Sequence, residues 1–454
     1  MTLNPLPVSL VDGQPWPPGP TALAAEQVQR WIETPVEFWE ECERLYGSIV
    51  RLELGSLGTV VMFSDPAAIK EIFQLPPHTF ECRHFNDHYR YVMGDHSLLL
   101  QDGEEHRRQR QLLSPIFRQD VLLQKVFAIR KLVLRAAATW PVGVPFNPRP
   151  SLQEIAFQVI LELMFAELSS ETSQGLLAAY RESVLRQVGS WGPWRRFTRL
   201  QPQIRRLLAT EIKTRRAEPD RPGAMSRLAN AQLSDGQPVT DAECEDHVFS
   251  LMVAGVDTTA VSLTWAMYWL SRESGVRKKL REELATVSTD RIEMDLFKLP
   301  YLDAVFCETL RMYPIVPTPS GRKLTTEARI ANHLFASGTT LVPCTYLVHR
   351  REDLYPQSDR FLPDRFLQRR FANYEYFPFG GGVRSCIGEM LAQMEFKTAV
   401  AAIFSRFDLQ TDHAALQPVR HGTLLAPSEE FRVIVHPIQP DSLAKSTDPP
   451  GTSE

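Results

Sequence analysis

A single cysteine, Cys386, follows a run of three glycines and precedes a long apolar segment. Glycine is unfavourable inside helices and strands, so the run Gly380–Gly382 predicts a sharp turn whose backbone can approach something flat and bulky. From Gly388 to Phe404 apolar residues recur at helical spacing, which predicts a helix. Cys386 therefore lies at a helix N-terminus, where the dipole and free backbone N–H groups favour the thiolate. Such a thiolate is a metal ligand or a nucleophile, whereas a lone buried cysteine in a turn would be structural.

The residues around this cysteine have an ordered spacing, formed by Phe379, Gly382, Arg384, Cys386 and Gly388. At these positions the chain resembles the cytochrome P-450 family of haem-thiolate monooxygenases, whose cysteine loop reads Phe-x-x-Gly-x-Arg-x-Cys-x-Gly. The resemblance implies one b-type haem with Cys386 as the ligand of its iron. A cysteine thiolate in that place donates electron density and favours O–O cleavage. The resemblance covers roughly residues 20–437, with four motifs in the family's order.

A long core helix is predicted to begin after Thr240, because Thr240 and Glu243 have the spacing of a capping box. The apolar pattern continues on nearly every side to about Ser271, which is typical of a helix that passes through a core. The same stretch could be mistaken for a membrane span. Asp257 at its centre would be costly in lipid, so we interpret it as a buried helix of a globular protein.

Small and polar residues interrupt the apolar pattern of this helix at Ala254, Gly255, Asp257 and Thr258. Ala254 and Thr258 share a face, and Gly255 lets another group approach the backbone. A buried threonine usually bonds back to its own helix, and a buried aspartate needs a partner. The resemblance implies instead that this stretch borders the oxygen-binding site and that Asp257 and Thr258 supply protons.

His106 and Arg110 are four residues apart and share one face of a predicted helix that starts near Asp102. Without further information they would form a solvated charged face. The resemblance implies that they hold the haem propionates, together with an arginine at position 322. It assigns cofactor contacts to His106, Arg110, Ala254, Gly255, Arg322, Phe379, Arg384 and Gly388.

Glu308 and Arg311 are three residues apart on another predicted helix and can form a side-chain pair. On a surface such a pair contributes little to stability. The resemblance implies that the pair is buried and is closed by Arg365 from the Pro363–Phe366 segment. This triad is expected to be structural, because it fixes the loop beneath the haem.

The predicted fold class is mainly α with a small β region, an α+β cytochrome P-450-like fold in a single large domain. An irregular proline-rich lead is expected at residues 1–22, the haem-thiolate domain at 23–437, and a disordered tail at 438–454, where apolar residues are few. The β region is predicted from alternating segments at 49–63 and from short strands between 315 and 345. Residues 76–100 are predicted to be a loop region.

Charge and cysteine usage restrict the location and the partners of the protein. The chain has 50 Lys and Arg against 54 Asp and Glu, a net charge of −4, which gives no case for nucleic acid binding. Its six cysteines are scattered without a CxxC pair, which favours free thiols in a reducing compartment. The start of the chain has neither the pattern of a signal peptide nor that of a membrane anchor. We therefore expect a soluble, cytoplasmic, bacterial monomer.

The resemblance implies insertion of one oxygen atom from dioxygen into a lipophilic small molecule, such as a fatty acid or a terpenoid. The sequence shows no flavin or iron–sulfur domain, so the electrons are expected from a separate ferredoxin or flavodoxin with its reductase. The alternatives are a haem-thiolate peroxygenase or isomerase and a non-catalytic haem sensor. The acid–alcohol pair Asp257–Thr258 favours the monooxygenase. A basic run between Arg195 and Arg206 is interpreted as a solvated face, or as a contact for an anionic substrate or a membrane surface.

Overall fold

The computed structural model describes residues 10–11, 14–168, 172–178, 192–233, 236–287, 295–411 and 416–438, with the side chains of 192–198 and 200 left aside. The disordered tail that the sequence predicts after Ile438 lies outside the described residues. So do the first nine residues of the proline-rich lead, and part of the basic run.

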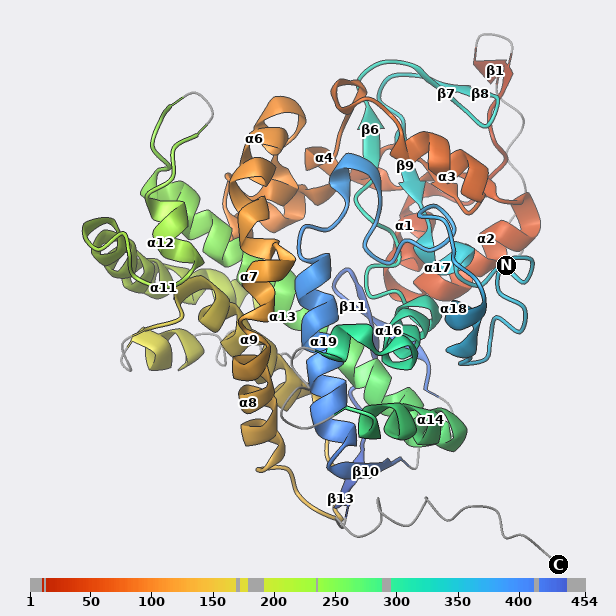
Figure 1. The fold of residues 1–454 in the computed structure, drawn as a ribbon. Helices are drawn as coiled ribbons and strands as arrows, with labels where there is room; N and C mark the ends of the chain where they lie inside the picture. Colours follow the sequence, from red (N-terminus) through yellow and green to blue (C-terminus); the bar gives the residue numbers. More distant parts are fainter. Residues whose placement is uncertain are drawn as a thin grey trace, which may run out of the picture.

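Helices make up most of the described chain (Figure 1). They are α1 (Ala24–Glu33), α2 (Pro35–Tyr46), α3 (Pro66–Phe73), α4 (Arg83–Asn86), α5 (Arg90–Met93), α6 (Gly103–Leu113), α7 (Gln119–Leu123), α8 (Val126–Ala137), α9 (Arg149–Phe165), α11 (Gly192–Ala217), α12 (Ala224–Ala229), α13 (Asp241–Arg272), α14 (Ser274–Ala285), α16 (Pro300–Met312), α17 (Thr345–Val348), α18 (Asp364–Gln368) and α19 (Glu389–Phe404).

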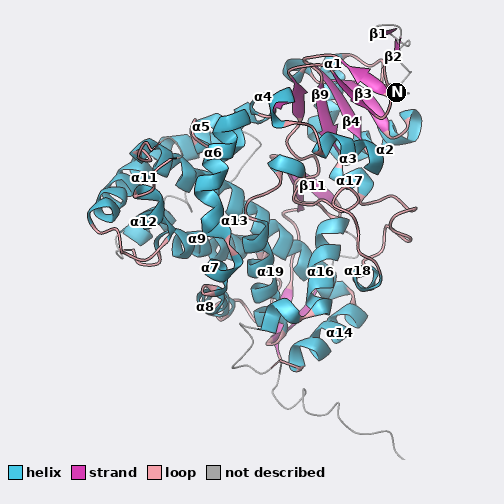
Figure 2. Cartoon of the chain, turned by 45° about the horizontal axis from the view of Figure 1, so that its top comes forward, coloured by secondary structure: helices cyan, strands magenta, loops and turns pink. Residues whose placement is uncertain are grey.

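The strands gather mainly at one end of the molecule (Figure 2). A sheet with the order β3-β4-β9-β6-β5 contains one parallel pair, β4 with β9. Four two-stranded antiparallel pairs, β1-β2, β7-β8, β10-β13 and β11-β12, complete the β structure of the described residues. The strands are β1 (Leu10–Val11), β2 (Gln14–Pro15), β3 (Ile49–Glu53), β4 (Thr59–Phe63), β5 (Phe80–Glu81), β6 (Arg322–Leu324), β7 (Ala328–Ile330), β8 (His333–Phe335), β9 (Thr340–Pro343), β10 (Phe407–Gln410), β11 (Pro418–His421), β12 (Leu424–Pro427) and β13 (Ile434–Pro437). The predicted mainly α fold with a small β region is confirmed.

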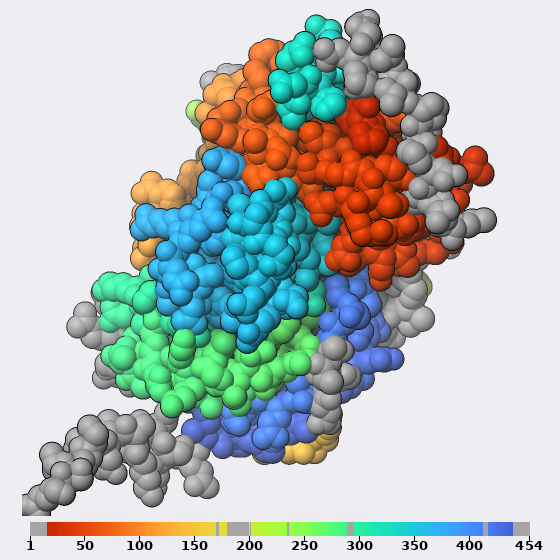
Figure 3. Space-filling model, turned by 90° about the vertical axis from the view of Figure 1, so that its right-hand side faces the viewer, coloured from red at the N-terminus to blue at the C-terminus, as the bar shows by residue number. Residues whose placement is uncertain are grey.

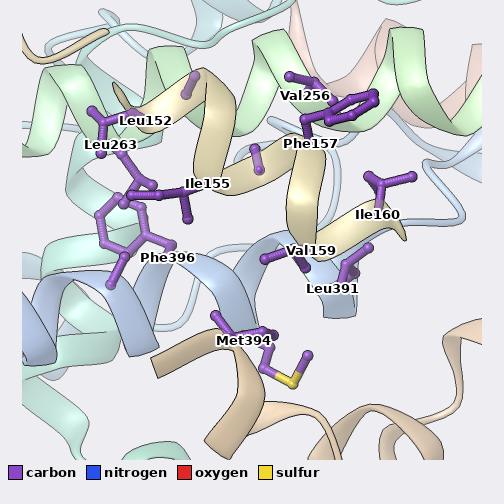
Figure 4. Packing of buried hydrophobic residues seen from close by; sticks show 14 of the residues in the cluster. Leu152, Ile155, Phe157, Val159, Ile160, Val256, Leu263, Leu391, Met394 and Phe396 are labelled. Atoms are coloured by element: carbon purple, nitrogen blue, oxygen red, sulfur yellow. The ribbon is translucent and has the colours of Figure 1, made fainter. Parts of the chain in front are cut away.

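The core of the helical part is a layer in which α9 lies between α13 and α19 (Figure 4). Side chains of α9 such as Leu152 and Phe157 point towards Val256 and Leu263 of α13 or towards the residues of α19. Every residue of α9 from Ile155 to Phe157 is buried, and apolar burial of this kind stabilises the fold by about 25 cal/mol for each Å² removed from water. This layer fixes the position of the small residues at the centre of α13.

The long helix α13 begins where the sequence predicts. The Glu243 backbone N–H donates to the Thr240 hydroxyl at 3.2 Å, and the Thr240 backbone N–H donates to the Glu243 carboxylate at 2.8 Å, which completes the capping box. Among the described helices α13 alone is long and apolar enough to cross a membrane, and most of its apolar window is buried inside the protein. The interpretation as a core helix is consistent with this burial.

Two predicted irregular regions contain ordered elements. Residues 76–100 include α4, α5 and the strand β5, which pairs Phe80 with Leu324 across a large sequence separation. The lead includes β1 and β2, and Trp16 after them contacts the ring of Phe335. Elements of two to four residues are too short to show a periodicity, and β5 in addition depends on a partner far away in the sequence. In Figure 3 the segment between α17 and α19 covers the face between the N-terminal part and α14.

Candidate functional site

A cavity of about 680 Å³ lies between α6, the centre of α13, the β11-β12 hairpin and the loop that carries Cys386. Most of the predicted site residues line it. These are His106, Arg110, Ala254, Gly255, Asp257, Thr258, Phe379, Arg384, Cys386 and Gly388. Arg322 and the predicted triad of Glu308, Arg311 and Arg365 are not among the residues that line this cavity.

The glycine run turns because it packs against Phe73 at the end of α3. A Cβ atom at Gly381 would lie 2.3 Å from the Phe73 ring, and one at Gly382 would lie 2.3 Å from the Phe73 carbonyl oxygen. Gly382 also has a φ of +66°, which side chains other than glycine rarely adopt. The flat, bulky group that these two glycines approach is therefore a phenylalanine of the protein itself.

The Cys386 thiol faces the cavity, and its own backbone N–H donates to the Phe379 carbonyl at 2.9 Å. Burial raises the pKa of Cys386, although the N–H groups of Gly388 and Glu389 at the start of α19 act in the opposite direction. The Glu389 carboxylate adds to the increase. Burial therefore acts against the thiolate that the helix N-terminus favours. A bound metal ion would favour the thiolate, because a coordinating thiol is deprotonated outright.

Cationic side chains border one part of the cavity. Arg110 donates to the Ser385 carbonyl at 2.7 Å, and Arg384 donates to the Gln101 carbonyl at 2.6 Å. His106 lies between them, and burial, followed by the charges of Arg384 and Arg110, lowers its pKa to about 3. The nearest ion-pair partner of either arginine among the described residues is Asp102, at 3.7 Å from Arg384. This corner of the cavity therefore carries excess positive charge.

Arg322 contacts the backbone of the glycine run. It is buried, donates through Nη2 to the Gly381 carbonyl at 2.8 Å, and lies over the rings of Phe73 and Phe80. Its Nε has no partner in the described part of the protein. Burial lowers the pKa of Arg322 to about 10. The structure thus places Arg322 against the glycine run. The contact of Arg322 with a haem propionate stays a prediction.

Small residues form part of the α13 wall of the cavity. Ala254 and Thr258 line it together, as their shared face predicts, and the Thr258 hydroxyl donates to the Ala254 carbonyl at 2.6 Å. The space beside Gly255 is filled by Ile160 of α9, whose Cδ1 would lie 2.8 Å from a Cβ at that position. Gly255 therefore borders the cavity and also lets the neighbouring helix α9 approach α13 closely.

Asp257 has a partner that the sequence did not suggest. Its Oδ1 accepts a hydrogen bond of 2.6 Å from Nε2 of Gln153 on α9. The two residues are 104 positions apart, so no local pattern could link them. This bond holds one oxygen of the Asp257 carboxylate, which lies beside Thr258. The Gln153 amide does not bind the other oxygen.

The predicted structural triad is assembled next to the loop segment. Glu308 accepts two bonds from Arg311, at 2.7 and 2.8 Å, and one from Arg365 at 3.1 Å, with Glu308 and Arg311 fully buried. Arg311 also donates to the carbonyls of His349, Ser358 and Arg360. It therefore ties α16 to the meander that leads to the cysteine loop.

The residues present fit one haem. The cavity is largely apolar, its loop offers a single thiol, and the excess positive charge of Arg110 and Arg384, beside the neutral ring of His106, suits the two carboxylates of that group. Cys386 would be the iron ligand. The two arginines and His106 would hold the propionates, while Phe379, Gly388, Ala254 and Gly255 would border the ring.

The chain matches the family model described as Cytochrome P450 over residues 14–435. It is 34% identical over 439 residues to cytochrome P450 135B1 of Mycobacterium tuberculosis, covering 92% of this chain and 91% of that relative. It is 29% identical over 411 residues to cytochrome P450 135A1 of the same organism, covering 87% and 88%.

Two solved structures have similar folds. The structure described as "Retinoic acid bound cyanobacterial CYP120A1" has a TM-score of 0.76 at 23% identity and covers 91% of this chain and 96% of its own. The structure described as "Crystal structure of cytochrome P450DA heme domain" has a TM-score of 0.78 at 19% identity, with 91% and 95% covered. At these identities the likeness concerns the fold.

Proposed function

Since the chain belongs to the cytochrome P450 family and is a haem-dependent monooxygenase, we propose that it oxidises a lipophilic small molecule with electrons from a separate donor. Haem bound through a cysteine thiolate supplies the activation of dioxygen. One oxygen atom enters the substrate, and the other leaves as water with two electrons and two protons. The protein must therefore bind the substrate, exclude bulk water and deliver protons.

One observation carries the proposal: a single apolar cavity contains both the Cys386 thiol and the Asp257–Thr258 pair. A sensor or a structural haem protein has no need for an acid and an alcohol at that place. The walls favour a lipophilic substrate, because they are formed largely by side chains such as Val92, Leu98, Leu113, Phe117, Leu251 and Leu391. Retinoic acid, which is bound in the structure of cyanobacterial CYP120A1, is a molecule of this class.

We assign proton delivery to Asp257 and Thr258. The Asp257 carboxylate is half-buried and oriented by Gln153, so it can take a proton from the solvent side and pass it on. The Thr258 hydroxyl uses its proton in the bond to Ala254 and keeps its lone pairs as acceptors. Rotation of the hydroxyl would turn a proton from the Ala254 carbonyl towards the cavity.

Replacing Thr258 with alanine is expected to uncouple the reaction. The protein should fold, bind haem and bind substrate, because the hydroxyl adds only a bond to its own helix. Positioned acid–base groups contribute about 10²–10⁴-fold to rates, so we expect oxygenated product per electron to fall about tenfold or more. Hydrogen peroxide should appear in its place. The measurement is product and peroxide formed per reducing equivalent consumed.

Thr264→Ala is the matched control. Thr264 lies on the same helix and donates to the Ala260 carbonyl at 2.7 Å, but it is buried and does not line the cavity. It should keep the coupling of the unmodified protein. Equal coupling in both alanine variants would leave Thr258 as a structural hydroxyl.

We propose a ferredoxin or flavodoxin with its reductase as the electron donor, and a soluble, cytoplasmic monomer as the working form. Two basic side chains of α6, the helix whose Arg110 contacts the cysteine loop, are already paired. Arg107 pairs with Glu104, Arg108 pairs with Glu105, and α6 carries both pairs. An acidic donor would therefore have to compete with these internal pairs.

Within the described part of the basic run, Arg199 and Arg206 are exposed, as a solvated face predicts, whereas Arg205 is paired. Arg205 of α11 donates to Glu245 at 2.6 Å and to Asp246 at 2.9 Å, both on α13. This arginine therefore joins α11 to the core helix, which differs from the solvated face that the sequence suggests. Arg195 and Arg196 have side chains outside the described residues.

A further inference from the structure

We propose that Arg420 binds the carboxylate of the substrate, so that the cavity takes a lipophilic acid in preference to its neutral analogues. This inference rests on the proposed function and narrows its substrate class. Arg420 belongs to β11, next to the tip of the β11-β12 hairpin, and lines the same cavity as Cys386 and Thr258.

The hairpin tip is held firmly against the segment that precedes α5. The Tyr89 hydroxyl and the Thr423 hydroxyl form a hydrogen bond, and the His88 ring lies against the Tyr89 ring with centroids 4.1 Å apart. His88, Tyr89 and Thr423 line the cavity with Arg420. Together they form a polar corner in walls that are otherwise largely apolar.

The Arg420 side chain is held by two backbone carbonyls. Its Nε donates to the Gly422 carbonyl at 2.7 Å, and its Nη1 donates to the carbonyl of Trp31, the buried tryptophan of α1. These two bonds hold the guanidinium plane in place. Nη2 donates no hydrogen bond to any described residue, and it is not fully buried. Nη2 of the guanidinium is therefore available to a ligand.

The charge of Arg420 has no carboxylate partner in the described part of the chain, where its electrostatic partner is the neutral Tyr89 hydroxyl. Two acidic residues also line the cavity, but Asp257 is bonded to Gln153, and Glu429 forms no ion pair with Arg420. The neighbouring imidazole of His88 adds no charge near neutral pH, since burial and the charge of Arg420 lower its pKa. A half-buried cation whose Nη2 is free is thus left in the polar corner of a largely apolar cavity.

An anionic ligand group would compensate this charge. A single guanidinium matches one negative charge, and its planar edge suits a carboxylate, whereas a dianionic phosphate would keep an unpaired charge inside the cavity. The positive corner of Arg110 and Arg384, next to the neutral His106, is a separate feature, because it is built by α6 and the cysteine loop. Arg420 is therefore the cation that we assign to the substrate carboxylate.

The test compares acids with neutral molecules of the same skeleton in the haem-loaded protein. The pairs are palmitic acid with methyl palmitate, and retinoic acid with retinol, with affinities measured by equilibrium dialysis and by the haem spin-state shift. We expect each acid to bind about tenfold or more tightly than its neutral partner. In Arg420→Gln the acids should lose about 10- to 100-fold in affinity, and the neutral molecules should change less than about twofold.

Two further variants make the result decisive. Arg420→Lys keeps the charge and should retain the preference for acids, even if Arg420→Gln is poorly stable. Arg432→Gln is the matched control, because Arg432 also donates to backbone carbonyls, at 2.6 and 2.9 Å, but is exposed and does not line the cavity. Equal affinity for acids and neutral molecules in the unmodified protein, or an equal loss for both in Arg420→Gln, would overturn the inference. Neither result would affect the monooxygenase function, which fails only if bound ligands cause no electron consumption.

Discussion

Replacing Cys386 with serine is expected to abolish oxygenation. Cys386 is the one thiol that faces the cavity among the described residues, and the other cysteines lie elsewhere in the fold. A serine hydroxyl is not ionised near neutral pH and does not replace the thiolate that donates electron density to the iron. In the reduced protein with carbon monoxide, the far-red-shifted Soret band of thiolate ligation should be lost, and product formation should fall below detection.

Cys307→Ser provides the control for this variant. Cys307 is partly buried on α16 and does not line the cavity, so its replacement should leave the band and the activity in place. A Cys386→Ser protein that keeps the shifted band would show that another residue binds the iron.

Replacing Arg311 with methionine is expected to cause the largest loss of stability. The change removes both bonds to Glu308 and the bonds to three backbone carbonyls, and it leaves the Glu308 carboxylate fully buried with Arg365 as its remaining cation. Breaking a buried ion pair by removing one partner costs about 3–5 kcal/mol. The midpoint of thermal or denaturant unfolding should fall accordingly, and haem content should fall with it because the meander before the cysteine loop loses its anchor.

Arg107→Met is a control with the same spacing. Arg107 pairs with Glu104 three residues earlier, as Arg311 pairs with Glu308, but both members of the Glu104–Arg107 pair are exposed. Surface pairs contribute about 0–1 kcal/mol, so this variant should unfold almost as the unmodified protein does. A similar unfolding midpoint for the two variants would contradict the structural role of the triad.

Motifs with fixed spacing allowed much of the site to be predicted. The cysteine loop, the pair on α6 and the small residues of α13 each lie within a few positions of one another, so helix and turn geometry decide which of their side chains share a face. The capping box of Thr240 and Glu243 likewise marked the start of α13. These local rules held because each element is long or strongly patterned.

Contacts between distant segments could not be read from one sequence. The Gln153–Asp257 bond, the packing of Phe73 under the glycine run, and the bond from Arg420 to α1 all join residues far apart in the chain. The rise in the pKa of Cys386 could not be read from the sequence either, because the burial that causes it is a tertiary property. Such features depend on which elements meet in the folded protein.

We propose that this protein uses electrons to insert one atom of dioxygen into a lipophilic ligand. The most direct test supplies the haem-loaded protein with a ferredoxin, its reductase and isotopically labelled dioxygen, and adds a ligand that shifts the haem spin state. We predict that electron and dioxygen consumption rise on addition of the ligand, and that the product carries one labelled oxygen atom. Ligand binding without a rise in consumption would indicate a sensor, and product without electron consumption would indicate a peroxygenase or an isomerase, and either result would contradict the account.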